Sequence, residues 1–220
     1  MTSSVNALLV LVLLLNLYLL GTSRIRALVQ GAALQGVILG TIPLLLHGLA
    51  GLAHGRAAVL PAAVAVAAIV LKGAAIPRML LKALRDAQIK REVEPLIGLV
   101  PTMLLGALGT AASIAFASRL PLVGGHAALL VVPAAFSTVF TGFLLLTTRA
   151  KAITQVIGYL ILENGIYLFG MLLLEAMPFL VELGVLLDLF VGVFVVSIII
   201  HHINREFASL DTRRLAALKE

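Results

Sequence analysis

Seven long apolar runs, separated by short charged segments, constrain the fold of this 220-residue chain more than any other feature. A helix that crosses the hydrocarbon core of a bilayer needs roughly 20 mostly apolar residues, and each run reaches or approaches that length. The sequence therefore predicts an all-α, polytopic transmembrane bundle of about seven helices. The expected helices are residues 5–20, 28–46, 57–76, 96–118, 127–147, 152–174 and 179–200.

The composition agrees with lipid as the solvent of this chain. Charged residues make up 12% of it, about half of their usual share in soluble domains, and 61% of it is hydrophobic. The absence of cysteine excludes thiolate-bound iron–sulfur clusters, Cys-ligated zinc and disulfides. No phosphate-binding loop or nucleophile motif is present, so we expect no cofactor and no metal site. The net charge is +6, and the basic residues lie beside the apolar runs, which indicates membrane topology rather than a nucleic-acid partner.

The basic residues predict how the helices are oriented. Cytoplasmic loops of membrane proteins are enriched in Lys and Arg. Seven helices place 13 of the 16 Lys and Arg residues on one side, whereas only Arg56 and Arg119 fall on the other. We therefore expect the N-terminus outside and the C-terminus inside. The inner bases are Arg24, Arg26, Arg78, Lys82, Arg85, Lys90, Arg91, Arg149, Lys151, Arg205, Arg213, Arg214 and Lys219.

A weak internal repeat suggests how the chain is divided. Residues 23–30 and 148–155 both precede a glycine-containing helix with one central polar residue, Gln35 in the first and Glu163 in the second. Repeats of this kind are typical of transporters, although apolar helices also resemble one another by chance. We expect a three-helix unit (1–76), a basic cytoplasmic loop (77–95), a fourth helix with an outer loop (96–126), a second three-helix unit (127–202) and a cytoplasmic tail (203–220). The loop is either an amphipathic helix on the inner surface or a plain connector.

Glu163 is the residue most indicative of chemistry. It lies near the middle of an expected helix, where a charged side chain costs about 2.5–3.5 kcal/mol on insertion scales. Tyr159 and Tyr167 are four residues away on either side and share its face, which must contact protein or water. A carboxyl group in such a place can take up and release protons near neutral pH. We favour a proton relay over a carboxyl group that only bonds a neighbouring helix.

Asp188 is expected at a similar depth in the last helix. Gly184 and Gly192 flank it at four-residue spacing, and such a small-residue face lets another helix approach closely. Two mid-membrane carboxyl groups on adjacent helices can exchange protons through water. The alternative is that Asp188 caps a kink or pairs with a hydroxyl group. Glu175 and Glu182, toward the outer end, are interpreted as solvated acids.

Two further residues are secondary candidates for the relay. Lys72 is expected near the inner end of the third helix, where snorkelling to the surface explains it well. His201 follows the last helix at the inner interface and titrates near neutral pH. The hydroxyl residues of the fourth and fifth expected helices are interpreted as helix-packing residues: Thr102, Thr110, Ser137, Thr138 and Thr141.

The strings GYLILENGIYLFG (158–170) and ELGVLLD (182–188) resemble hydrogenase-4 component E. That family contains membrane subunits of formate-hydrogenlyase-like and energy-converting hydrogenase complexes. Its C-terminal helices are in turn similar to the K subunit of respiratory complex I and the C subunit of multisubunit antiporters. This type of subunit has two intramembrane glutamates on successive helices. By this resemblance Glu163 corresponds to the first, and Asp188 takes the place of the second at closer spacing.

The resemblance implies a non-catalytic, multi-pass subunit of the prokaryotic inner membrane that takes part in proton translocation. Its partners would be antiporter-like membrane subunits and a cytoplasmic hydrogenase-type redox module, within the lipid bilayer. A stand-alone secondary transporter and a purely structural anchor are the alternatives. Whether the ion is a proton or sodium stays open at this point.

Overall fold

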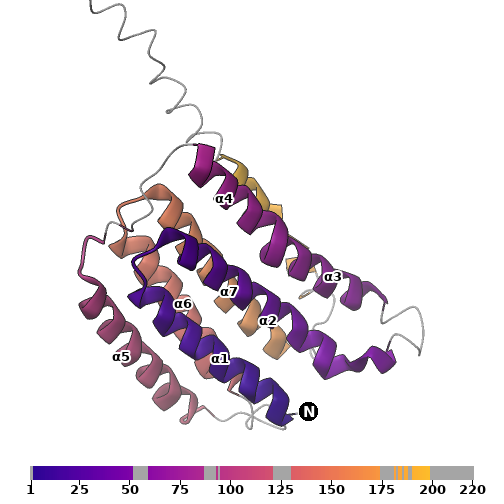
Figure 1. Cartoon of the computed structure of the whole chain (residues 1–220). Coiled ribbons are helices and arrows are strands. Elements are labelled where there is room, and N and C mark those ends of the chain that lie inside the picture. Colours follow the sequence, from indigo (N-terminus) through magenta and orange to yellow (C-terminus); the bar gives the residue numbers. More distant parts are fainter. Residues whose placement is uncertain are drawn as a thin grey trace, which may run out of the picture.

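The computed structural model is helical throughout its regular elements (Figure 1). It describes residues 2–51, 59–86, 93, 95–120, 130–173, 181, 183, 184, 186, 187 and 190–198. The helices are α1 (Thr2–Gly21), α2 (Ile25–Gly51), α3 (Val59–Val70), the π-helical turn η2 (Leu71–Ala75), α4 (Ile76–Asp86), α5 (Leu99–Ala117), α6 (Val131–Thr148) and α7 (Ala152–Leu173). Residues 190–198 are helical as well.

Five helices of the described part are long and apolar enough to cross a membrane, namely α1, α2, α5, α6 and α7. Helix α3 with η2, and the helical residues 190–198, lie where the sequence predicts the third and seventh spans. The protein is a multi-pass helical membrane bundle, as the apolar runs predict. Its orientation in the membrane remains a prediction.

The third helix does not end near Ile76, as expected, but continues through η2 to Asp86 (Figure 1). Pro77 normally clashes with the carbonyl four residues earlier in an α-helix. The wider π turn that precedes it gives the chain room at that position, with the Ile76 N–H bonded to the Leu71 carbonyl. Beyond the turn the helix buries Leu80 and Leu84 and exposes its bases, so residues 76–86 are amphipathic. The exposed bases are Arg78, Lys82 and Arg85.

Helices α6 and α7 form the most closely packed pair. A Cβ atom on Gly142 would lie 2.4 Å from the backbone nitrogen of Leu162, and one on Gly165 would lie 2.6 Å from that of Val139. Without a hydrophobic driving force between helices in lipid, small residues that let backbones approach are the main source of association. The pair therefore forms a rigid support for the side chains that α7 carries.

Two buried apolar clusters stack along the bundle. One, near the basic loops, contains Leu20, Ile25 and Ile157, and the other, at the opposite end, contains Leu9, Ile42 and Leu168. Between them, each of α1, α2, α6 and α7 contributes buried polar side chains. We call this set the polar layer: Asn16, Gln35, Ser137, Thr138, Glu163 and Asn164.

Arg149 joins the connections at the basic end of the bundle. Its side chain is fully buried, and its Nη2 donates a hydrogen bond of 2.8 Å to the Leu20 carbonyl at the end of α1. Its backbone pairs with Pro95 in an isolated bridge, next to a hydrogen bond from Leu96 N to Thr148 O. Burial lowers the pKa of Arg149, yet a guanidinium stays protonated in proteins. Its positive charge thus stabilises the carbonyl end of α1.

Candidate functional site

Glu163 lies at the centre of the polar layer. It is eleven residues after Ala152, which at roughly 1.5 Å per residue is about 16 Å along the axis of α7. Its side chain is 1% exposed, and Lys72 Nζ lies 3.8 Å from its Oε2. A carboxyl group and an amine therefore face each other deep inside the bundle.

Lys72 comes to this depth because it belongs to the π turn η2. Its Nζ donates a hydrogen bond of 3.1 Å to Asn164 Oδ1 and lies 6.0 Å from the centroid of the Tyr167 ring. The expectation that Lys72 snorkels to the inner surface is therefore wrong. The wide turn interrupts the helical repeat and directs the side chain toward α7, and single π turns of this kind are frequent at functional sites.

Glycines allow η2 to approach α2 closely. A Cβ atom on Gly36 would lie 2.8 Å from Lys72 Cβ, and one on Gly73 would lie 2.4 Å from Val37 Cγ2. Neither space accepts a larger residue without a shift of the π turn. Two glycines on facing elements thus permit the close approach of the Lys72 backbone to α2.

The helical residues 190–198 cover Glu163 from another side. A Cβ atom on the buried Gly192 would lie 3.1 Å from Glu163 Oε2 and 3.2 Å from its Oε1. This is the close approach that the small-residue face of the last helix predicts. Gly184, by contrast, has no atom within 4 Å of such a Cβ and is exposed. Asp188 and His201 lie outside the described residues, so their predicted roles remain predictions.

A directed chain of hydrogen bonds leads away from Lys72 across the bundle. Asn164 Nδ2 donates to Gln35 Oε1 (3.2 Å), and Gln35 Nε2 donates to Asn16 Oδ1 (2.8 Å). Asn16 Nδ2 then donates to Thr138 Oγ1 (2.9 Å) and more weakly to Ser137 Oγ (3.4 Å). Each amide uses its oxygen to accept from one side and its NH₂ to donate to the other.

The same chain ends on α5. Ser137 Oγ lies 2.8 Å from Thr110 Oγ1, and the Thr110 hydroxyl also donates to the Gly106 carbonyl. Because the single Thr110 proton goes to Gly106, Ser137 is the donor in the first bond. All donors therefore point from Lys72 toward α5, and such chains strengthen each bond in them.

Amides and hydroxyls do not titrate near neutral pH, so this chain orients groups rather than storing protons. Its effect at the site is specific. Because the Asn164 NH₂ group donates to Gln35, the Asn164 oxygen is the atom that faces the Lys72 ammonium.

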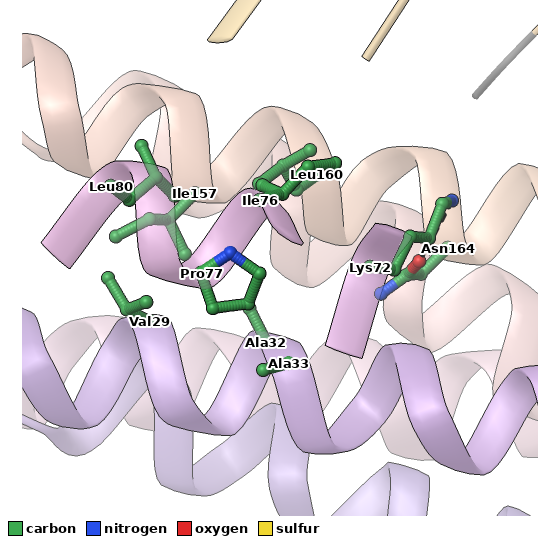
Figure 2. Close-up of a pocket in the computed structure, with 10 residues that line it drawn as sticks. All are labelled: Val29, Ala32, Ala33, Lys72, Ile76, Pro77, Leu80, Ile157, Leu160 and Asn164. Atoms are coloured by element: carbon green, nitrogen blue, oxygen red, sulfur yellow. Dashed lines mark hydrogen bonds between the residues drawn. The ribbon is translucent and has the colours of Figure 1, made fainter. Parts of the chain in front are cut away.

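Two small cavities flank Lys72 and Asn164. One lies between α2, α4 and α7, with Ile76 and Pro77 in its wall (Figure 2). The centre of a water molecule can occupy about 20 Å³ of it. The other, of about 10 Å³, is bordered by Gly36 and Tyr167. A water molecule needs roughly 10–15 Å³ by this measure and polar partners, so the first cavity has room for one water beside Lys72 and the second is marginal.

Two tyrosines flank Glu163 on α7. Tyr159 and Tyr167 are both half-buried, and Tyr167 presents its ring to Lys72. Gln155, eight residues before Glu163 on α7, donates a hydrogen bond from its Nε2 to the Arg149 carbonyl, which gives it a structural role. Among the described residues, no group of three or more His, Cys, Asp or Glu side chains could hold a metal ion.

Comparison with known proteins places the chain in a family. It is 33% identical over 199 residues to the uncharacterized protein Rv0085 of Mycobacterium tuberculosis, an alignment that covers 89% of this chain and 87% of that protein. The chain belongs to the Rv0085 family. No family model and no solved structure matches it.

The resemblance to hydrogenase-4 component E is confirmed for part of this member of the Rv0085 family. The Escherichia coli K12 and Shigella flexneri proteins of that name are each 33% identical to it over 101 residues. These alignments span 46% of this chain and 46% of each relative, so they cover about half the length of component E.

Several residues of the site were not predicted from the sequence. Asn16 carries a signal in retrospect, because it is the one amide inside the leucine-rich run of residues 7–20. Gln35 is evident in the sequence as the central polar residue of its helix, but its hydrogen bonds to Asn16 and Asn164 are not. Ser137, Thr138 and Thr110 do link helices, as a packing role implies, but they do so as members of the chain that ends at Lys72.

Proposed function

We propose that this protein is a non-catalytic membrane subunit of a hydrogenase-type, complex I-like assembly and that its buried carboxyl group takes part in coupled proton translocation. The observation that carries this proposal is the contact of 3.8 Å between Lys72 Nζ and Glu163 Oε2 inside the polar layer. The partial similarity to hydrogenase-4 component E supports the kind of assembly. Its partners would be antiporter-like membrane subunits and a cytoplasmic redox module.

A buried pair of this kind is suited to moving a proton. In water the ionic form of a lysine and a glutamate is strongly favoured, but desolvation inside a bundle costs both ions several kcal/mol. The ionic form and the neutral form, with the proton on the carboxyl group, therefore become closer in free energy. A change of charge or position nearby can then shift the proton from one group to the other.

The remaining predicted residues extend this path. Glu163 would be the main proton carrier and Lys72 its partner, with water in the adjacent cavities as the link. Tyr159 and Tyr167 flank the carboxyl group on α7. From the sequence, Asp188 would be the second carrier and His201 would lie at the inner end of the path.

The test is the variant Glu163→Gln in the intact assembly. Glutamine keeps the size and polarity of the side chain but carries no exchangeable acid proton. We expect the assembly to copurify normally, redox turnover to continue, and proton uptake by inverted membrane vesicles to be lost. The matched control is Glu175→Gln, which removes an acid predicted to be solvated and should leave uptake unchanged.

Two results would argue against the proposal. Normal proton uptake by Glu163→Gln would leave the buried acid without a role in transport. Purification of the wild-type chain from native membranes without any larger partner would favour the stand-alone transporter.

A further inference from the structure

Three groups that bind cations converge on the Lys72 ammonium, and all come from one stretch of α7. Asn164 Oδ1 lies 3.1 Å from Nζ, Glu163 Oε2 lies 3.8 Å from it, and the centroid of the Tyr167 ring lies 6.0 Å from it. Carboxylate and amide oxygens are the ligands of hard metal cations, and an aromatic face attracts any monovalent cation. This part of α7 therefore offers a site for a monovalent cation, and Lys72 fills it.

We propose that Lys72 acts as a tethered cation that occupies a monovalent-cation site on α7 and keeps Na⁺ out of it. The site then exchanges protons alone. This inference rests on the proposed function for its meaning, because it names the ion that the assembly moves.

The space around the site supports exclusion of Na⁺. Of the two flanking cavities, the one of about 20 Å³ has room for one water molecule, and the one of about 10 Å³ is marginal for one. A sodium ion with enough oxygen ligands needs more room than this beside an ammonium group, and it would repel that group strongly at a separation of a few ångströms. A proton requires no added volume, because it binds to an oxygen or nitrogen already present.

Lys72 cannot easily give way to a competing ion. Gly36 and Gly73 let the π turn pack directly against α2, so the backbone of Lys72 has little room to shift toward that helix. The side chain leaves that turn toward Asn164, as Figure 2 shows for the two labelled residues. The ammonium group is thus presented to α7 by the fold itself.

The hydrogen-bond chain keeps the site in its cation-binding form. An asparagine can present either its oxygen or its NH₂ group, and only the oxygen attracts a cation. Because Gln35 accepts from Asn164 Nδ2 and itself donates to Asn16, the Asn164 oxygen stays directed at the cation position. Removal of the Lys72 side chain should therefore leave a space that faces the Asn164 and Glu163 oxygens and the Tyr167 ring and is suited to Na⁺.

The experiment measures binding of radioactive sodium to the full-length protein in lipid nanodiscs at alkaline pH. Wild type should show no saturable binding, and Lys72→Ala should show it. The double variant Lys72→Ala/Glu163→Gln should bind roughly tenfold more weakly or not at all, because it lacks the carboxylate. Lys82→Ala is the matched control, since Lys82 is exposed on α4 and its removal should leave the protein unable to bind sodium.

Saturable sodium binding by wild type would overturn the inference, and so would its absence in a folded Lys72→Ala protein. If Lys72→Ala does not fold, Lys72→Met keeps most of the buried stem and gives the same test, and the wild-type measurement stands alone in any case. Failure here is separable from failure of the proposed function. Lost proton uptake in Glu163→Gln together with no sodium binding in the lysine variants would refute only the tethered cation. Normal proton uptake in Glu163→Gln together with sodium binding in the lysine variants would refute only the role in transport.

Discussion

Asn16 shows how much of this site depends on single polar side chains from different helices. It stands in the leucine-rich part of α1, yet it accepts from Gln35 and donates to Thr138 and Ser137, so it links α1, α2 and α6. Removing one partner of a buried hydrogen bond leaves the other polar group desolvated and unpaired. That loss costs more free energy than replacing both partners by apolar groups. The stability of the polar layer is therefore a property of the connected set.

Replacing Asn16 by Leu should destabilise the protein. The change leaves the NH₂ group of Gln35 buried without its acceptor, and an unsatisfied buried donor costs about 1–3 kcal/mol. Loss of helical circular dichroism in a denaturing detergent titration measures this, since the chain has no tryptophan to follow.

Thr147→Val is the control for that measurement. Thr147 is exposed, and its hydroxyl donates only to carbonyls of its own helix, so the variant should unfold at nearly the wild-type detergent concentration. Equal unfolding of the two variants would show that the chain of amides adds little to stability.

At this scale the sequence predicts which residues are unusual but not what they contact. A glutamate in the middle of an apolar run is costly wherever the helix lies, so Glu163 is evident from the sequence. Its partner is not, because the rotation of α3 and α4 about their axis depends on the π turn. The sequence alone therefore predicts that Lys72 reaches the membrane surface, and the π turn instead directs it to Glu163 and Asn164.

At the scale of the helix pair, the contact between α6 and α7 should be the least tolerant of added volume. A Cβ atom at Gly142 meets the backbone of Leu162 at 2.4 Å, and backbone atoms cannot move aside as the end of a side chain can. We expect Gly142→Ala to destabilise the bundle by about 1–3 kcal/mol, the usual range for overpacking.

Gly184→Ala is the matched comparison, because a Cβ at Gly184 meets no atom within 4 Å. Alanine favours helices over glycine, so this variant should be neutral or slightly more stable in the same detergent titration. If both alanine variants unfold alike, close backbone packing is not what holds α6 to α7.

The boundaries of the elements were predicted well except around η2. The apolar runs locate α1, α2, α5, α6 and α7 within a few residues, because a span of given thickness requires a given length. The run through Ile76, Pro77 and Arg78 reads as a helix end, since proline and charge usually terminate a span. Nothing local in the sequence shows that a π turn just before Pro77 lets the helix continue.

At the scale of the whole molecule, the described basic residues outside η2 gather at one end, with the exception of Arg119. Arg24 and Lys151 lie where α1 ends and α7 begins, and Arg78 lies on α4. Arg149 links the end of α1 to the segment at Pro95. Arg119, at the far end of α5, lies at the opposite end of the bundle (Figure 1). Because cytoplasmic loops attract Lys and Arg, the end with more bases should face the cytoplasm.

The chain contains no cysteine, so single cysteines can report this orientation without any background labelling. Ser118 and Ala150 are exposed residues at opposite ends of the bundle, the first just after α5 and the second between α6 and α7. In intact spheroplasts a membrane-impermeant maleimide should label Ser118→Cys, whereas Ala150→Cys should react only after the membrane is opened. Labelling of Ala150→Cys alone in intact spheroplasts would show that the orientation is the reverse of the predicted one. The basic end would then face outward, and a cytoplasmic redox module could not meet the bundle at the end where its loops are tied together by Arg149.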